Sequence, residues 1–72
     1  MNKLSLQGFG QRIRSVRVGL GIQQNDLADR LGMYNGYLSE IENGYKIPSM
    51  KRAVLIANAL GVGMDYLLGE VE

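Results

Sequence analysis

The most restrictive feature of this sequence is a run of apolar residues at helical spacing within residues 24–43. In the first half, Leu27, Ala28 and Leu31 fall at i, i+1 and i+4 on one helical face, and in the second half Leu38 and Ile41 fall at i and i+3. Gly32 separates the two halves, where a helix end commonly needs a left-handed backbone that glycine adopts without strain. The pattern predicts two short helices that cross through a tight turn.

The rest of the chain predicts three more helices. One helix is expected at about 6–19, because apolar residues recur there at three- and four-residue steps: Leu6, Phe9, Ile13, Val16 and Leu20. Ser49 is a good N-cap for a helix over 50–60, and a short helix follows at about 64–68. Asn35-Gly36 is a hairpin signal, but the periodicity around it is helical. The expected fold is all-α, with five short helices around one core, and the middle pair lies at about 24–31 and 35–42.

Composition limits the class of protein. Seventy-two residues make one small domain, so 1–72 is expected to be a single unit. The sequence has no cysteine and no histidine, which excludes disulfides and argues against zinc or catalysis. The longest apolar run, 53–57, is too short to span a bilayer, and no signal-peptide core is present. We expect a cytoplasmic protein without enzymatic activity, cofactor or metal.

Charge is unevenly distributed, although the net charge is only +1. Residues 1–35 carry five basic and two acidic side chains, whereas residues 36–72 carry three basic and five acidic ones. A basic half suits a protein that presents one face to a phosphate backbone. An ordinary solvated surface has the same composition, so charge alone does not decide between the two.

Four segments carry a resemblance to a known family. They occur in one register between Phe9 and Leu68 and read FGQRIRSVR, QNDLADRLGMYNGYLSEIEN, ENGYKIPS and IANALGVGMDYLL. In this arrangement the chain resembles the phage-repressor and Cro-like (XRE) helix-turn-helix family. The resemblance implies a compact five-helix repressor-like domain with its helix-turn-helix at about 24–43. The second helix of that motif, about 35–42, would enter the major groove of DNA.

The resemblance also implies that this recognition helix reads base edges with its exposed residues. Asn35 can bond the N6 and N7 edge of adenine, and Glu40 can accept from N4 of cytosine. A tyrosine can lie against a thymine methyl group or donate its hydroxyl to phosphate. The expected base-reading residues are Tyr34, Asn35, Gly36, Tyr37, Ser39 and Glu40.

Three of these positions have a second interpretation. Tyr37 can instead pack on the domain surface, because a tyrosine often has a buried ring and an exposed hydroxyl. Glu40 can be a solvent-facing partner of a nearby arginine. Gly36 has no side chain to read a base, so either the helix backbone lies closer to the groove or the protein relies more on DNA shape.

A second group of residues is expected to contact DNA phosphates. Gln24 begins a helix, where backbone amides and the helix dipole favour an anion. In similar repressors a glutamine here donates to a phosphate and braces the first residue of the recognition helix. Lys51, beside Arg52, opposes the dipole of the fourth helix and so suits an external anion. The expected phosphate-binding residues are Arg14, Gln23, Gln24, Asn43, Tyr45, Lys46 and Lys51. Ordinary polar surface residues are the alternative, above all for Gln24 and Lys46.

Two structural features follow from the same resemblance. Arg17 and Glu42 match a largely buried ion pair that joins the first helix to the end of the third. The fourth and fifth helices carry more apolar residues than one small domain can bury, and related domains pair two copies through this region. The expected dimer residues are Leu55, Val62, Tyr66 and Leu68, with Val71 added to the same surface.

The leading hypothesis is a sequence-specific regulator of transcription that binds double-stranded DNA. Most simply it is a repressor, acting as a homodimer on a near-palindromic operator. Two alternatives on the same scaffold remain open. One is a protein-interaction module that has lost DNA binding, and the other is an antitoxin that binds a toxin and represses its own operon. No membrane contact and no small-molecule site are expected.

Overall fold

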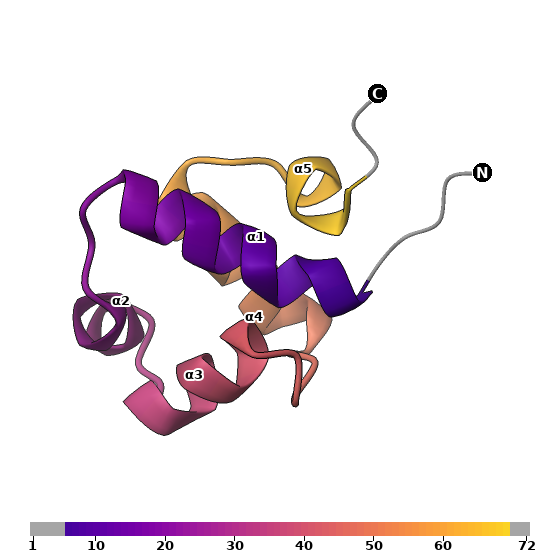
Figure 1. The fold of residues 1–72 in the computed structure, drawn as a ribbon. Helices are drawn as coiled ribbons and strands as arrows, with labels where there is room; N and C mark the ends of the chain where they lie inside the picture. The colour runs from indigo at the N-terminus through magenta and orange to yellow at the C-terminus, as the bar shows by residue number, and fades with distance from the viewer. Residues whose placement is uncertain (1–5, 70–72) are drawn as a thin grey trace.

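Five α-helices make up the described part of the chain in a computed structural model (Figure 1). The structure describes residues 6–69, with side chains from Gly8 onward. The helices are α1 (Leu6–Gly19), α2 (Gln24–Arg30), α3 (Asn35–Glu42), α4 (Met50–Leu60) and α5 (Met64–Leu68). No strand occurs within residues 6–69, so the predicted all-α fold is confirmed. Asn35 and Gly36 open a helix and do not form a hairpin turn.

The helix boundaries follow local signals in the sequence. Before α4, Ser49 has an extended backbone, and its hydroxyl accepts a 3.2 Å hydrogen bond from the backbone N–H of Arg52. Helix α2 ends at Arg30, one residue earlier than predicted, and Leu31 is its C-cap with φ −93° and ψ 0°. Gly32 follows with φ +66°, a left-handed conformation that turns the chain toward α3.

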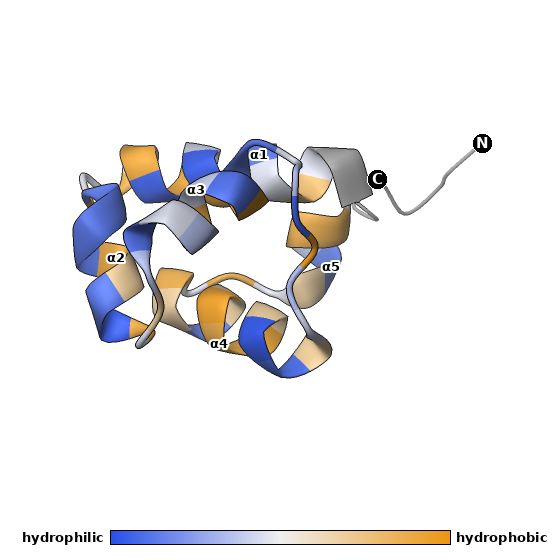
Figure 2. Cartoon of the chain, turned by 90° about the horizontal axis from the view of Figure 1, so that it is seen from below, coloured by the Kyte–Doolittle hydropathy of each residue, from blue (hydrophilic) through white to orange (hydrophobic). Residues whose placement is uncertain are grey.

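One hydrophobic core receives side chains from all five helices. Its largest fully buried members are Ile13, Leu27, Leu38, Ile41, Ile56 and Leu67. Burying a side chain of this size contributes about 1.5–3 kcal/mol to the stability of the fold. Apolar and polar residues alternate along α1 and α4 in Figure 2, as expected for helices with one buried face. None of the helices in the described range has the length and apolar character that a membrane span requires.

The helix predicted at about 6–19 is confirmed, but Leu20, the last residue of the apolar series behind that prediction, is not buried. Phe9 and Ile13 are buried and Val16 packs against the core, but the Leu20 side chain is 56% exposed. The reason is that α1 ends at Gly19, so Leu20 lies in the following turn and no longer keeps the helical phase. The side chain of Leu6 lies outside the described part of the structure.

Helices α1 and α3 approach each other most closely at Gly10. A Cβ atom at this position would overlap the carbonyl oxygen of Ile41 and would lie 2.8 Å from that of Glu42. Only glycine therefore allows α1 to rest directly on the backbone of α3. The sequence pattern did not single out Gly10, because nothing in the spacing of apolar residues indicates where two backbones touch. The close approach fixes the end of α3 against α1.

Candidate nucleic-acid interface

Helices α2 and α3 form two arms joined by a short turn over residues 31–34 (Figure 1). The backbone N–H of Met33 donates to the carbonyl of Ala28, which ties the turn to the preceding helix. Leu27 and Ala28 on α2 and Leu38 and Ile41 on α3 are buried, so both arms rest on the same core. This is the arrangement predicted from residues 24–43.

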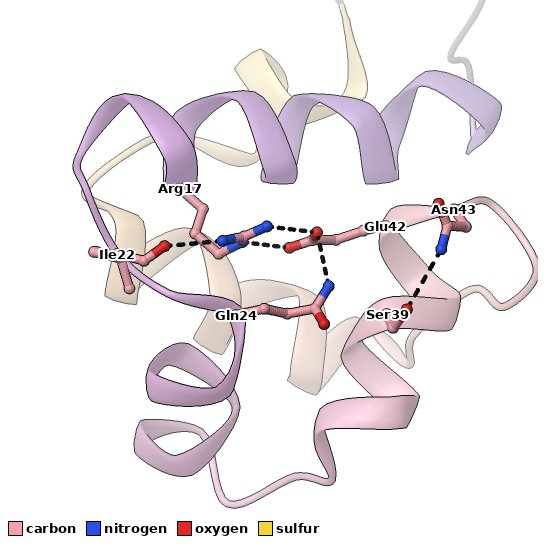
Figure 3. A network of polar contacts seen from close by, with 6 residues as sticks. All are labelled: Arg17, Ile22, Gln24, Ser39, Glu42 and Asn43. Atoms are coloured by element: carbon pink, nitrogen blue, oxygen red, sulfur yellow. Dashed lines mark hydrogen bonds and ion pairs between the residues drawn. The ribbon is translucent and has the colours of Figure 1, made fainter.

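A buried ion pair joins the end of α3 to α1. Arg17 donates from Nε to Oε2 of Glu42 at 2.7 Å and from Nη2 to Oε1 at 3.0 Å (Figure 3). Its Nη1 donates to the carbonyl of Ile22 at 2.8 Å. Arg17 and Glu42 are only 8% and 4% exposed. The pair expected between these residues is therefore present, and it also fixes the α1–α2 turn.

Gln24 adds a third helix to this network. Its Nε2 donates to Oε1 of Glu42 at 3.0 Å (Figure 3). In this structure the Gln24 amide contacts the last residue of α3, and the expected brace to the first residue of that helix stays a prediction. Because the Glu42 carboxylate is close at hand and already held by Arg17, the glutamine amide braces the last residue of α3. Glu42 becomes the point where α1, α2 and α3 meet.

A polar depression, which we call the first hollow, opens beside this network. It has a volume of about 600 Å³ and is lined by Arg14, Arg17, Val18, Gly21, Ile22, Gln23, Gln24, Ser39, Glu42 and Asn43. Four of the residues expected to bind phosphate therefore surround one hollow: Arg14, Gln23, Gln24 and Asn43. Asn43 also donates to the Ser39 hydroxyl at 3.4 Å. Arg14 is the exposed cation of the first hollow, because Arg17 is buried and paired with Glu42.

The first turn of α3 is the most open part of the motif. Tyr34 precedes the helix with an extended backbone, its side chain makes no capping hydrogen bond, and it is 86% exposed. Asn35 and Gly36 are exposed as well. A Cβ atom at Gly36 would meet nothing within 4 Å. This end of α3 is free to face a partner.

The other expected base-reading residues of α3 have partners within the protein. Ser39 is half-buried and accepts the bond from Asn43. Glu40 is exposed, and one of its carboxylate oxygens lies 3.9 Å from Nζ of Lys46. The charged partner of Glu40 is thus a lysine, where the sequence interpretation named an arginine.

Tyr37 lies on the opposite flank of α3 from the first hollow. It is half-buried against the core, with the Arg52 guanidinium 5.3 Å and Lys46 Nζ 6.0 Å from its ring centroid. Of the two interpretations given for Tyr37, packing on the domain surface agrees with this geometry. The sequence analysis named Arg52 only as a neighbour of Lys51. Its contact with Tyr37 was not predicted, because the two residues lie 15 positions apart in the sequence.

Two further expected phosphate-binding residues are exposed. Tyr45 follows α3 and lines a depression together with Arg14 and Asn43. Its backbone N–H donates to the carbonyl of Glu40 at 2.8 Å, which orders the loop after the helix. Lys51 lies in the first turn of α4.

Comparison with known proteins shows which family the chain belongs to. A helix-turn-helix family model matches residues 13–67. The chain belongs to the XRE-type helix-turn-helix family. This match covers both arms, the Arg17–Glu42 ion pair that joins α1 to α3, and all but the last residue of α5.

Individual relatives agree with this membership. The HTH-type transcriptional regulator ImmR of Bacillus subtilis (strain 168) is 33% identical over 64 residues, which are 89% of this chain and 50% of the regulator. The immunity repressor protein of Bacillus phage phi105 is 33% identical over 61 residues, or 85% of this chain and 42% of the repressor. The chain thus spans about half the length of the curated relatives it matches.

A solved structure shows the same fold over nearly its full length. The restriction-modification controller protein C.AhdI from Aeromonas hydrophila aligns with a TM-score of 0.79 and 32% identity. The alignment covers 86% of this chain and 94% of that protein. The fold described here therefore accounts for nearly the whole of that structure.

The residues expected at a dimer interface differ in exposure. Leu55 on α4 is 43% exposed and Tyr66 on α5 is 44% exposed. Val62 and Leu68 are half-buried and pack against the core of this helix-turn-helix domain. Val71 lies outside the described residues.

Proposed function

We propose that this chain is a DNA-binding transcriptional regulator that inserts α3 into the major groove. The observation that carries the proposal is the division of α3 into two parts. Its last turn is fixed through Glu42 to Arg17 and Gln24, whereas its first turn is exposed at Tyr34 and Asn35. A recognition helix needs this combination, because base edges are read by side chains whose backbone is held rigidly.

Base contacts in this proposal are concentrated at the open end of the helix. Asn35 has the amide that pairs with the N6 and N7 edge of adenine, and Tyr34 has an accessible ring and hydroxyl. Gly36 leaves room for the groove to approach the helix backbone. Glu40, whose carboxylate lies 3.9 Å from Lys46 Nζ, would accept from cytosine N4.

The first hollow is the proposed binding site for a DNA phosphate. Arg14 supplies the positive charge, and the side-chain amides of Gln23, Gln24 and Asn43 supply neutral donors around it. Contacts of this kind fix the register of a protein on DNA and carry no sequence information by themselves. Tyr45, Lys46 and Lys51 would extend the contact along the backbone.

We further propose that residues 1–72 act as a repressor in the form of a two-fold homodimer. The name of the phage phi105 relative, an immunity repressor, supports repression, and the exposed Leu55 and Tyr66 support self-association. Val62 and Leu68 would complete the interface. Two recognition helices about 34 Å apart would then read a near-palindromic operator. Because the ligand is cellular DNA, the site of action is the cytoplasm.

Selection from a random duplex library, followed by salt titration, tests the function. We expect enrichment of a motif with two half-sites, and log K that falls linearly with log salt by about 0.9 for each phosphate contacted. Binding that stays independent of sequence would reduce the protein to a general DNA binder. Absence of binding to any duplex at low salt would favour a protein-interaction module.

A further inference from the structure

A second hollow lies on the other flank of the recognition helix. It has a volume of about 530 Å³ and is lined by Asp29, Gly32, Met33, Tyr34, Tyr37 and Arg52. Helix α3 presents Ser39 and Asn43 to the first hollow but Tyr34 and Tyr37 to the second. At 100° per residue these pairs fall on opposite sides of the edge that carries Gly36 and Glu40. The two hollows therefore flank the exposed edge of the helix.

Arg52 is the cation of the second hollow. Its guanidinium stands 5.3 Å from the centroid of the Tyr37 ring. Within residues 8–69 the ion pairs are Arg17–Glu42 and Lys46–Glu40, so Arg52 has no carboxylate partner there, although Asp29 lines the same hollow. A guanidinium held over an aromatic ring is restricted in direction and still has its N–H groups free to donate.

We propose that Arg52 binds a DNA phosphate in the second hollow and that Tyr37 positions it. The inference rests on the proposed DNA-binding function. A major groove about 12 Å wide is nearly filled by an α-helix with its side chains, so both phosphate backbones come to lie beside the helix. Arg14 in the first hollow would contact the phosphate backbone of one DNA strand, and Arg52 in the second hollow would contact that of the other strand. A guanidinium suits a phosphodiester because its N–H groups match two phosphate oxygens.

The second cation near Tyr37 is less suited to this task. Lys46 Nζ is 6.0 Å from the ring centroid and 3.9 Å from a carboxylate oxygen of Glu40. The positive charge of Lys46 is therefore already partly neutralised by the Glu40 carboxylate. Arg52 is the cation on this flank that lies over an aromatic ring and has no carboxylate partner within residues 8–69.

Salt-dependent binding of Arg52→Gln to a duplex selected by the wild-type protein tests the proposal. We expect affinity to fall about tenfold, since a hydrogen bond to a charged group contributes on that scale. The slope of log K against log salt should become shallower by about 0.9, with the base preference unchanged. Arg52→Lys should keep the slope and lose part of the affinity. Arg30→Gln is the matched control, because Arg30 is exposed on α2 and lines neither hollow, and its slope should equal that of the wild type.

Tyr37 is tested through its coupling to Arg52. Tyr37→Phe keeps the ring and should keep the slope, whereas Tyr37→Leu should weaken binding by an amount that disappears in the Arg52→Gln background. Thermal melts show that the variants compared are folded. A wild-type slope in folded Arg52→Gln overturns the proposal and leaves DNA binding intact. A changed base preference in Arg52→Gln assigns Arg52 to base reading and also overturns it. Failure of the wild-type protein to bind any duplex removes the proposed function and this inference together.

Discussion

The guanidinium of Arg17 and the carboxylate of Glu42 meet through two hydrogen bonds inside this small helical domain, and Gln24 joins them from a third helix. The pair holds the end of the recognition helix at a fixed distance from α1. A buried ion pair is costly to break from one side, because the remaining charge then has no partner. The fold and the proposed DNA recognition by α3 are thereby linked through one carboxylate.

Arg17→Ala should lower the free energy of unfolding by about 3–5 kcal/mol, because it leaves the Glu42 carboxylate buried and unpaired. Urea unfolding followed by circular dichroism measures the change. Arg14→Ala is the matched control on the same helix, since Arg14 is exposed and should change stability little. The double variant Arg17→Met and Glu42→Leu should recover much of the loss. An unchanged unfolding midpoint in Arg17→Ala would contradict the structural role of the pair.

Gly10→Ala should destabilise the domain by about 1–3 kcal/mol or more, which is the range for overpacking a close contact. The added methyl group overlaps the Ile41 carbonyl, so α1 must move away from α3. Gly19→Ala is the control on the same helix, because a Cβ atom there meets nothing within 4 Å. We expect Gly19→Ala to be neutral or stabilising in the same thermal melt. Equal melting temperatures for the two variants would argue against the close approach at Gly10.

Gly36→Ala should stabilise the fold by up to about 1 kcal/mol, since alanine favours a helix over glycine and the position opens onto empty space. Gly32→Ala should have the opposite effect, because Gly32 adopts φ +66°. Chemical unfolding of both variants measures the contrast. If Gly36→Ala also weakens DNA binding without loss of stability, the groove lies close to the backbone at this position. Unchanged binding would mean that Gly36 has spare room even in the complex.

Leu55→Ser combined with Tyr66→Ser should shift the protein from dimer to monomer in analytical ultracentrifugation, because both side chains lie exposed on the proposed interface. Their exposure in the monomer means that the fold itself should lose little stability. Leu20→Ser is the control, since Leu20 is comparably exposed but lies in the α1–α2 turn. A wild-type protein that sediments as a monomer at high concentration would rule out the dimer.

The sequence predicted local features well, because helix periodicity and caps depend on neighbouring residues. The bounds of α3 and the Ser49 cap are examples. Features that depend on contacts between distant residues were harder to predict. The Arg17–Glu42 pair was expected only through the family resemblance, and the bond from Gln24 to Glu42 was not expected. The close contact at Gly10 and the contact of Arg52 with the Tyr37 ring left no periodic signal, since each joins residues on two different helices.

The open first turn of α3 can change in sequence without disturbing the fold. Tyr34, Asn35 and Gly36 support neither the core nor the Glu42 network, so substitutions at these positions carry little thermodynamic penalty. If these residues read bases as proposed, operator preference can change while the scaffold stays unchanged. An exchange of these three residues for those of another family member should change the selected operator while the rest of the molecule stays as it is.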